Sequence, residues 1–326
     1  ADFSSSTEYY VQVTDTAFDD SAGNSYTGIT NKTTLSFTTA DVVVPTVNGV
    51  SSSTGNGTYK AGDVINLAAA FSESVDVVTT GGTPTLELET GSTNQTATYS
   101  SGTGSSTLVF SYTVQSGDTT SDLDYTSTSA LALNNGTIKD SAGNNATLTL
   151  ASSGASGSLA ANQALVIDGV APTMSSTSPA DNATAVGVDS NIILTFLEAV
   201  DIETGNIVIY KSTDDSVVET IDVTSDQVSE TGSNQITIDP TADFSSSTEY
   251  YVQVAATAFD DTAGNSYAGI TDKTTLSFTT ADVGVPTLSS YSPSYGATDV
   301  AIDSNIVLNF SEVVDQETGN IVIYKL

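Results

Sequence analysis

Three sets of acidic and amide side chains recur in step along the chain, and their oxygen atoms are of the kind that binds hard divalent cations. The first set is an Asp four residues before a Pro-Thr pair, the second follows an apolar strand-like segment, and the third lies in the motif Asp-x-Ala-Gly-Asn. Ca²⁺ takes about six to eight oxygen ligands, from carboxylates, carbonyls and water. The candidate ligands are Asp41, Asp168 and Asp282 in the first set, Glu73, Asp76, Glu198, Asp201, Glu312 and Asp315 in the second, and Asp140, Asn144, Asp260, Asp261 and Asn265 in the third, whose motif recurs at Asp20 and Asn24.

Each set also has a simpler interpretation that the sequence leaves open. Asp-x-Ala-Gly-Asn suits a tight turn, in which Gly adopts a positive φ and the Asp and Asn side chains satisfy backbone groups. A Glu after a strand can be an ordinary solvated residue. Mg²⁺ fits less well than Ca²⁺, because several flexible loops rarely build a tight octahedron, and the spacing is not that of an EF-hand.

Catalytic chemistry has little support in the sequence. The chain has no His and no Cys, which excludes Ser-His-Asp and Cys-His arrangements and zinc sites built on His. The acidic pairs Asp214-Asp215 and Asp260-Asp261 lie in polar segments, where carboxylates stay ionised. There is no Gly-x-Ser-x-Gly or Ser-x-x-Lys motif and no glycine-rich strand-to-helix turn. We therefore expect no catalytic residue, no organic cofactor and no enzymatic activity.

The charge balance narrows the choice of partners. The chain has 39 acidic and 6 basic side chains in 326 residues, a net charge of −33 at pH 7. Such a surface repels nucleic acid and anionic membranes. Bound divalent cations would relieve this self-repulsion, although a solvated surface adapted to salt water or secretion would look similar. No apolar run approaches the ~18 residues of a membrane span, and the first residues read as the interior of a domain without a signal peptide.

Internal repeats define the organisation of the chain. Residues 1–41 recur at 242–282 with five differences, and 174–211 recur at 288–325. The three junction Asp residues are 127 and 114 residues apart, each a suitable length for one sandwich domain. The expected domains are a C-terminal partial domain at 1–42, complete domains of two types at 43–169 and 170–283, and an N-terminal partial domain at 284–326.

The two partial domains are complementary but lack a counterpart of residues 212–241, which we expect to form a hairpin. Unpaired strand edges seldom stay free, so the ends are candidates for self-association into a dimer or a head-to-tail fibre.

Alternating apolar and polar residues predict many short strands, and no window shows convincing helical periodicity. This pattern, with abundant Thr, Val, Gly, Ser and Asn, is typical of an all-β fold. The expected strands include 63–67, 85–88, 106–114 and 164–167 in the first complete domain, and 191–196, 206–210, 249–254 and 275–280 in the second.

Tyrosines are the candidate platforms for carbohydrate, since there is no Trp. In the strand pairs Tyr9-Tyr10 and Tyr250-Tyr251 we expect one ring in the core and one at the surface, because successive side chains point to opposite faces. Tyr26 and Tyr267 are expected to pack over the Ala-Gly-Asn turn or to face a ligand such as a surface glycan.

Residues 170–283 resemble the bacterial Ig-like domains of large surface proteins. The resemblance rests on Ser-Asn-Ile-x-Leu-x-Phe-x-Glu-x-Val-Asp, Ser-Ser-Thr-x-Tyr-x-Val and Phe-x-Asp-x-Ala-Gly-Asn. Residues 43–169 resemble a second Ig-like repeat through Gly-Thr-Tyr-Lys-Ala-Gly-Asp-Val-Ile, Phe-Ser-Glu-Ser-Val-Asp and Ala-Leu-Val-Ile-Asp-Gly-Val-Ala-Pro.

This resemblance implies tandem immunoglobulin-like β-sandwich domains in an extended rod, with partial domains at both ends. It also implies an extracellular or bacterial cell-surface location and a role as the spacer or stalk of an adhesin-like protein. An adhesive or glycan-binding module is the alternative, and a hydrolase from an environmental library a second one. In an Ig-type sandwich the loop after the second strand, the loop before the last strand and the incoming linker meet at one pole. The three acidic sets would then meet there and bind Ca²⁺ at the domain junctions.

Overall fold

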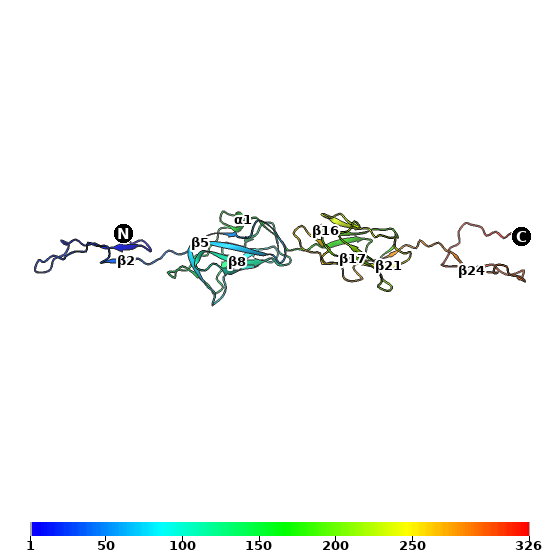
Figure 1. The fold of residues 1–326 in the computed structure, drawn as a ribbon, viewed down its shortest axis with the longest axis horizontal. Coiled ribbons are helices and arrows are strands. Elements are labelled where there is room, and N and C mark those ends of the chain that lie inside the picture. The colour runs from blue at the N-terminus through cyan, green and yellow to red at the C-terminus, as the bar shows by residue number, and fades with distance from the viewer. Residues whose placement is uncertain (1, 326) are drawn as a thin grey trace. The chain divides into compact units, whose positions relative to one another are not determined.

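Strands joined by turns and irregular loops form nearly all of the computed structural model, which describes residues 2–325 (Figure 1). Within that range the one helix is α1 (Leu159–Asn162). Ser158 caps its N-terminus, because the Oγ of Ser158 accepts a hydrogen bond from the Ala161 amide. No helix in the described part of the chain has the length and apolar character needed to cross a membrane. The predicted all-β class is confirmed.

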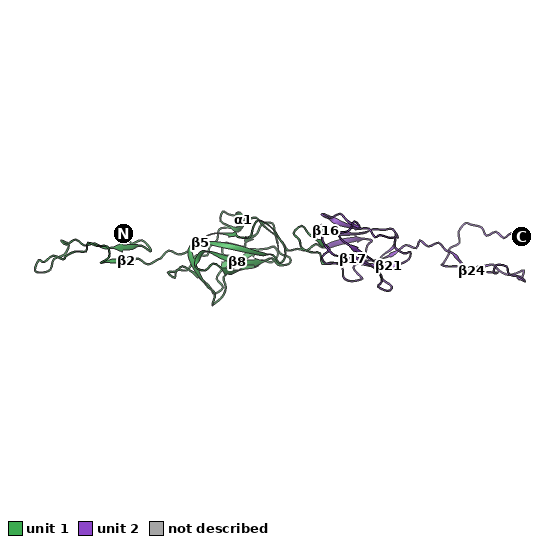
Figure 2. Ribbon diagram, viewed as in Figure 1, with its two compact units in different colours: residues 1–173, 198–201, 259–268 green, residues 174–197, 202–258, 269–326 purple. Residues whose placement is uncertain are grey.

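The described chain separates into two compact units (Figure 2). Unit 1 comprises residues 1–173 together with 198–201 and 259–268, and unit 2 comprises 174–197, 202–258 and 269–326. Two short segments of the second repeat type are therefore counted with unit 1. Among residues 2–325, no sheet includes strands from both sides of 42/43, 169/170 or 283/284.

Unit 1 contains a small two-stranded sheet followed by a sandwich. β1 (Glu8–Tyr10) pairs antiparallel with β2 (Ser36–Thr38). The large sheet has the order β10-β6-β7-β8-β5-β12, with β3 also on β5 and β11 also on β6, and the small sheet has the order β4-β13-β9. The strands are β3 (Val47–Ser52), β4 (Gly57–Tyr59), β5 (Val64–Val78), β6 (Thr85–Glu89), β7 (Gln95–Ser101), β8 (Ser105–Thr113), β9 (Thr119–Thr120), β10 (Asp124–Tyr125), β11 (Leu131–Ala132), β12 (Thr137–Lys139) and β13 (Leu165–Asp168).

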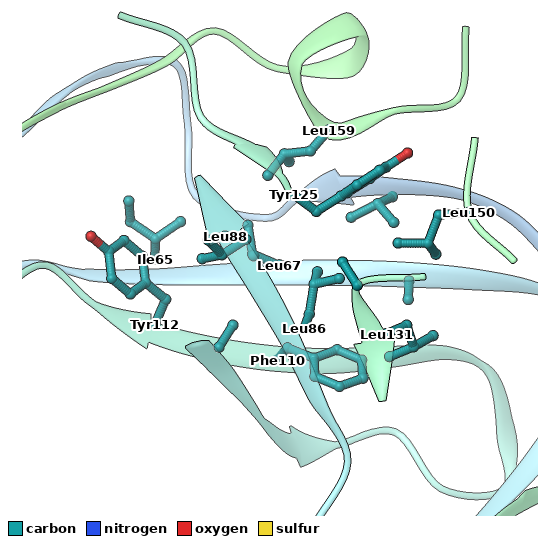
Figure 3. Packing of buried hydrophobic residues seen from close by; sticks show 14 of the residues in the cluster. Ile65, Leu67, Leu86, Leu88, Phe110, Tyr112, Tyr125, Leu131, Leu150 and Leu159 are labelled. Carbon is teal, nitrogen blue, oxygen red and sulfur yellow. The ribbon is translucent and has the colours of Figure 1, made fainter. Parts of the chain in front are cut away.

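The core of this sandwich follows from alternation along its strands. Every second side chain of β5 from Ile65 to Phe71 is buried, and Leu108, Phe110 and Tyr112 repeat the pattern on β8. Leu86, Leu88, Leu159 and Tyr125 complete the cluster seen in Figure 3. Burying one such side chain contributes about 1.5–3 kcal/mol, so this alternation is what makes the segment fold.

Residues 174–280 form two further sheets of five strands. One has the order β14-β16-β20-β19 with β22 also on β16, and the other has the order β15-β23-β21-β17-β18. The strands are β14 (Met174–Ser178), β15 (Ala183–Val186), β16 (Ile192–Ile202), β17 (Asn206–Lys211), β18 (Val217–Asp222), β19 (Val228–Ser229), β20 (Ser233–Ile238), β21 (Glu249–Val254), β22 (Phe259–Asp260) and β23 (Ser277–Thr280), and the C-terminal partial repeat adds β24 (Leu288–Ser292) and β25 (Val307–Phe310), which pair with each other.

Two expectations about local structure were wrong. The segments 217–223 and 235–239 do not pair with each other as the expected hairpin requires, because β18 pairs with β17 in one sheet while β20 pairs with β16 and β19 in the other. The intervening segment therefore changes sheet, and Ile221 and Ile236 are both buried. The strands expected to end at Leu67 and Phe196 instead continue to Val78 and Ile202.

The expectation for the tyrosine pair was also wrong in the complete repeat. Tyr250 and Tyr251 are both buried, although they point to opposite faces of β21. On the outer face the Tyr251 ring stacks on Tyr210 of the neighbouring strand, with centroids 4.8 Å apart, and Lys273 lies over it. Neighbouring side chains thus cover a ring that strand alternation alone would leave exposed.

Candidate functional site

The motif Asp-x-Ala-Gly-Asn folds into the same turn at each of its three positions. In the turn at 140–144, the Asp140 carboxylate accepts hydrogen bonds from the Asn144 amide nitrogen (2.8 Å) and Nδ2 (2.7 Å). Gly143 has φ +96°, a conformation that side chains with a Cβ adopt only under strain. The counterpart bonds from Asn265 to Asp261 are 2.8 and 2.9 Å long. The turn chemistry that the sequence left open is present in the fold.

The asparagine of the turn also holds the preceding linker. Nδ2 of Asn144 donates to the carbonyl oxygens of Asp41 and Val43, each at 3.3 Å. Nδ2 of Asn265 donates to the carbonyl oxygen of Asp168 at 2.8 Å. Because these bonds hold the backbone of Asp41 and Asp168 against the turns, they also place the two Asp side chains beside them.

The turn at 261–265 has two further partners, both within unit 1. Oδ1 of Asn265 accepts a hydrogen bond from the Ala61 amide (3.1 Å), and Nζ of Lys60 donates to the Gly264 carbonyl (2.7 Å). Sequence reasoning missed Lys60 and Ala61. A lysine ammonium group and a backbone amide are donors and offer no oxygen ligand, so a search for cation ligands passes over them.

One carboxylate from each of the three predicted sets meets in unit 1. Oxygens of Asp41, Glu73 and Asp140 all lie within 4.8 Å of one another, the one such triad among residues 2–325. Two oxygens bound to a single Ca²⁺ can be at most about 5 Å apart, twice the Ca–O distance of about 2.5 Å. The triad therefore has the spacing of a cation site, with the linker, β5 and the turn each supplying one group.

The pKa shifts within the triad indicate that its negative charge is not balanced by neighbouring cationic side chains. Burial, and then the negative charges of Asp41 and Asp140, raise the pKa of the Glu73 carboxyl. Burial of Asp140 would by itself raise its pKa, but the hydrogen bonds from Asn144 and the turn amides outweigh this and lower it. The ionised form of Asp140 is therefore stabilised, whereas the ionised form of Glu73 is disfavoured.

A second triad repeats this electrostatic plan with wider spacing. Burial, then Asp261, then Asp168 raise the pKa of Glu198. Asp261 is buried, whereas Asp168 and Glu198 are half-buried. The order of causes is the same as at Glu73, with a turn Asp and a linker Asp as the two charged neighbours.

The third counterpart consists of the linker residue Asp282 and of Glu312, which follows β25, without a turn. Asp282 accepts hydrogen bonds from the Gly284 amide and from Ser246 Oγ, both 3.0 Å long, which lower its pKa together with hydrogen bonds involving Ser247 and Glu312. The matching turn motif in the partial repeats is the one at Asp20 and Asn24, in the N-terminal part of the chain.

Four predicted ligands, Asp76, Asp201, Asp260 and Asp315, lie outside these triads. Asp76 lies three residues beyond Glu73 on β5 and is exposed, and an odd separation places side chains on opposite faces of a strand. Asp315 is exposed in the C-terminal partial repeat. Asp201 and Asp260 are half-buried, on β16 and β22. The unexpected length of β5 and β16 explains why only part of the second set reaches the linker.

Comparisons with known proteins identify one family. A family model described as a bacterial Ig-like domain matches residues 168–280 and 282–325. No curated protein gives a significant match. Domains of this family usually occur in surface or extracellular proteins and are in general not enzymes.

Three solved structures share local similarity with parts of the chain. CopC from Methylosinus trichosporium OB3b is 15% identical, with a TM-score of 0.26 over 35% of this chain and 97% of its own. The N-terminal part of the bacterial S-layer protein SbsC is 18% identical, with a TM-score of 0.25 over 36% of this chain and 25% of its own. A chimeric titin Z1Z2-Z1Z2 tandem carrying a fibronectin GRGDS peptide is 10% identical, with a TM-score of 0.20 over 74% of this chain and 100% of its own.

The first matched stretch runs from Asp168 to Thr280 and spans the sheets of residues 174–280, and the second begins at the next junction residue, Asp282. From residue 168 onwards, this chain belongs to the bacterial Ig-like domain family.

Proposed function

We propose that the chain is a spacer segment of a bacterial surface or secreted protein, and that Ca²⁺ bound at its linkers stiffens the junctions between domains. The observation that carries this proposal is the triad of Asp41, Glu73 and Asp140, whose oxygens share one small volume. An ion there would tie the linker to a strand and to a turn of the domain that follows.

The repetition of this arrangement favours a structural role over a single recognition site. Asp168, Glu198 and Asp261 repeat the linker, strand and turn positions one domain later. A ligand-recognition site does not need to recur at each linker, whereas a rigid spacer has to be stiffened at every junction. The chain also has no His or Cys with which to build common catalytic centres.

Glycan binding, the alternative from the sequence, has less support in the complete domain. Tyr250, Tyr251 and Tyr267 are buried, so they present no open ring to a sugar. Glycan binding stays a prediction for other parts of the surface.

Calcium titration by isothermal calorimetry on the full chain tests the proposal. We expect saturable binding with a Kd of about 1 mM or tighter, the range of extracellular calcium modules, weaker binding of Mg²⁺, and a melting temperature that rises with Ca²⁺. A chain that takes up no Ca²⁺ at millimolar concentration, and melts identically in EDTA, contradicts the calcium proposal.

Glu73→Gln removes one charge of the first triad with little change in shape, and the Glu73 side chain makes no hydrogen bond that the change would break. We expect it to lose one class of calcium site. Asp76→Asn is the matched control, because it lies on the same strand and removes the same charge from an exposed position. Equal loss from both variants would mean that Ca²⁺ neutralises the surface in general and binds at no defined site.

A further inference from the structure

Residues 259–268 belong by sequence to the second complete repeat (170–283), yet they are part of unit 1, together with the first complete repeat (43–169). Within this segment Asp261 and Asn265 are 4% and 6% exposed. Polar side chains that are buried to this degree need hydrogen-bond partners. The partners of these two side chains therefore identify the surface that the segment contacts.

The turn at 261–265 offers two acceptors that its own hydrogen bonds leave available. Nδ2 of Asn265 is already used within the turn and on the linker. Oδ1 of Asn265 accepts from the Ala61 amide at 3.1 Å, and the Gly264 carbonyl accepts from Nζ of Lys60 at 2.7 Å. Each donor lies 204 residues before its acceptor, in one short turn of the first complete repeat.

The sequence Lys-Ala-Gly-Asp at 60–63 fixes the shape of this donor turn. The Asp63 amide donates to the Lys60 carbonyl at 3.1 Å, and Gly62 has φ +94° while Ala61 has a negative φ. This is the pattern of a type II turn with Ala61 at its second position. The amide of that position takes no part in the hydrogen bond of the turn, so it is free to donate to another segment.

The linker that follows the first complete repeat is anchored to the same unit. The Gly169 amide donates to the Asp118 carbonyl at 2.7 Å, and the Gly117 amide donates to the Gly169 carbonyl at 2.8 Å. A Cβ on Gly169 would overlap the carbonyl oxygen of Gln115, so the close approach requires glycine. Asp118 is buried, and its carboxylate accepts a 2.6 Å bond from the Tyr112 hydroxyl. The linker is thus tied to the core of the first complete repeat.

Hydrogen bonds hold the turn at 261–265 in place more than apolar packing does. A hollow of about 240 Å³ is lined by the donor turn, the linker and residues 264–266, and no apolar side chain larger than alanine faces it. A hydrogen bond from a charged donor is about twice as strong as one between neutral groups. We therefore expect the bond from Lys60 to contribute most to the contact.

We propose that the turn at 60–63 holds the turn at 261–265 in a calcium-independent latch, which makes the second complete repeat depend on the first for part of its stability. Lys60 and Ala61 are the positioning residues of this latch. They bind a carbonyl oxygen and an Asn side chain, both presented by Gly264 at φ +89°. The latch does not rest on the proposed function, although the turn that it holds also belongs to the second acidic triad.

Hydrogen exchange of the full chain in EDTA gives the first test. The amides of residues 263–265 all donate to Asp261, so their protection reports whether the turn opens. Lys60→Met removes Nζ and keeps most of the stem, and should lower this protection about tenfold or more. Lys139→Met is the matched control, because it removes the same charge from a half-buried position of the same repeat, on β12.

Ala61→Pro removes the second donor with little disturbance to its own repeat. Proline has no amide hydrogen, and it is favoured at the second position of a type II turn. We expect the first complete repeat to be as stable as the parent or slightly more so. The protection of residues 263–265 should nevertheless fall about fivefold, since the bond to Asn265 is lost. A variant that strengthens one repeat and loosens a turn of the other separates the latch from general destabilisation.

A double-mutant cycle tests whether the latch couples the two repeats. Leu67 is fully buried in the first complete repeat, so Leu67→Ala should destabilise that repeat strongly. With the latch intact, Leu67→Ala should also lower the urea midpoint of the second complete repeat and the protection of residues 263–265. In the Lys60→Met/Ala61→Pro background this second effect should disappear. A Leu67→Ala chain whose first repeat is unfolded gives the same readout.

Three results would overturn the proposal: protection at 263–265 that neither Lys60→Met nor Ala61→Pro lowers, a loss as large from Lys139→Met, or a second repeat that Leu67→Ala leaves unchanged. The measurements are repeated with Ca²⁺ to separate the two proposals. Coupling in EDTA in a chain that binds no Ca²⁺ would support the latch and contradict the calcium sites. Calcium binding without any effect of the Lys60 and Ala61 variants would do the reverse.

Discussion

The side-chain amide of Asn265 donates a 2.8 Å hydrogen bond to the carbonyl oxygen of Asp168, 97 residues earlier in the chain. The same side chain binds Asp261 through Nδ2 and accepts from the Ala61 amide through Oδ1. One buried amide thus fixes the turn and the linker at once.

Replacing Asn265 should therefore be costly. We expect Asn265→Ala to destabilise the surrounding domain by about 1–3 kcal/mol, because it leaves buried backbone groups without partners. The measurement is the urea midpoint of that domain's unfolding transition. Asn24→Ala, in the matching turn at residues 20–24, is the control and should have little effect, since Asn24 is exposed.

The raised pKa of Glu73 gives a pH dependence of known sign. A carboxyl whose folded-state pKa exceeds its unfolded value disfavours folding once it ionises, so stability is highest below about pH 4 and falls as pH rises through the folded-state pKa. In EDTA, Glu73→Gln should raise the melting temperature at pH 7, and the gain should vanish at pH 3.5. A variant less stable than the parent at pH 7 would show that the Glu73 carboxylate is stabilised by its neighbours.

Phe259 and Phe18 occupy the same position of two near-identical repeats with opposite burial. Phe259→Ala should cost about 3–5 kcal/mol in the complete domain, as for other buried aromatic side chains. Phe18→Ala should change the stability of the monomer by less than about 0.5 kcal/mol. Hydrogen exchange of each repeat measures both effects in one chain. A comparable loss of stability from both variants would mean that Phe18 is buried in the folded chain.

Gly143 tests the turn itself. A Cβ at this position meets no atom within 4 Å, so the cost of Gly143→Ala comes from its positive φ alone, about 1–2 kcal/mol. Gly264→Ala should cost more, because its Cβ would lie 3.2 Å from Nζ of Lys60. Gly319→Ala, with open space and no positive φ, should be neutral. Chemical denaturation of the three variants checks this order.

Much of the fold could be predicted because its signals are local. Alternation along residues 65–71 and 192–196 indicates half-buried strands, and both segments form them. The repeat of 1–41 at 242–282 likewise predicts one conformation at two places, and β1 with β2 reproduces β21 with β23.

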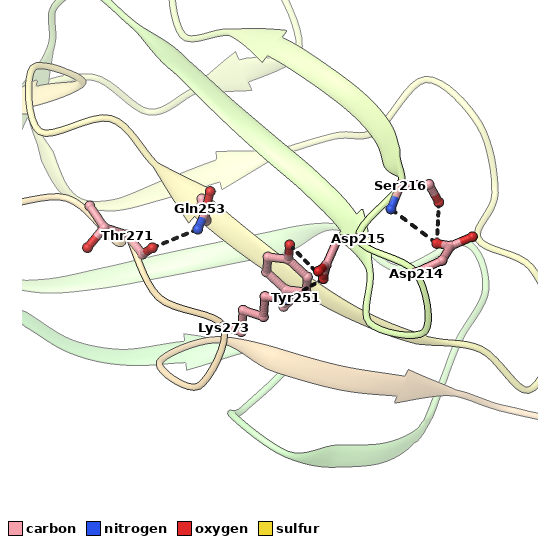
Figure 4. A network of polar contacts seen from close by, with 7 residues as sticks. All are labelled: Asp214, Asp215, Ser216, Tyr251, Gln253, Thr271 and Lys273. Carbon is pink, nitrogen blue, oxygen red and sulfur yellow. Dashed lines mark hydrogen bonds and ion pairs between the residues drawn. The ribbon is translucent and has the colours of Figure 1, made fainter.

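The errors concern choices that depend on distant partners. Whether β18 pairs with β20 or with β17 depends on which sheet edge is free, and no residue of 212–241 encodes that edge. The ring of Tyr251 is covered because Tyr210 and Lys273 come from other parts of the chain. Asp215 adds to that cover by accepting a hydrogen bond from Tyr251 and pairing with Lys273, next to the Asp214–Ser216 turn (Figure 4).

The candidate site could be predicted in kind but not in membership. Topology indicates that linker, strand and turn converge, and Asp41, Glu73 and Asp140 do so. Separating Glu73 from Asp76 required knowing that β5 continues through both, because only then do they fall on opposite faces.

Lys60 is one of only six cationic side chains in the chain, and its Nζ donates a hydrogen bond to the carbonyl oxygen of Gly264. A cation used in this way positions a turn and neutralises no carboxylate. Salt ions must then screen the mutual repulsion of the acidic groups, which extends over about 30 Å at 0.01 M ionic strength but only about 8 Å at 0.15 M. We therefore expect the folded state to be less stable at low ionic strength and more stable at high ionic strength, even without divalent ions.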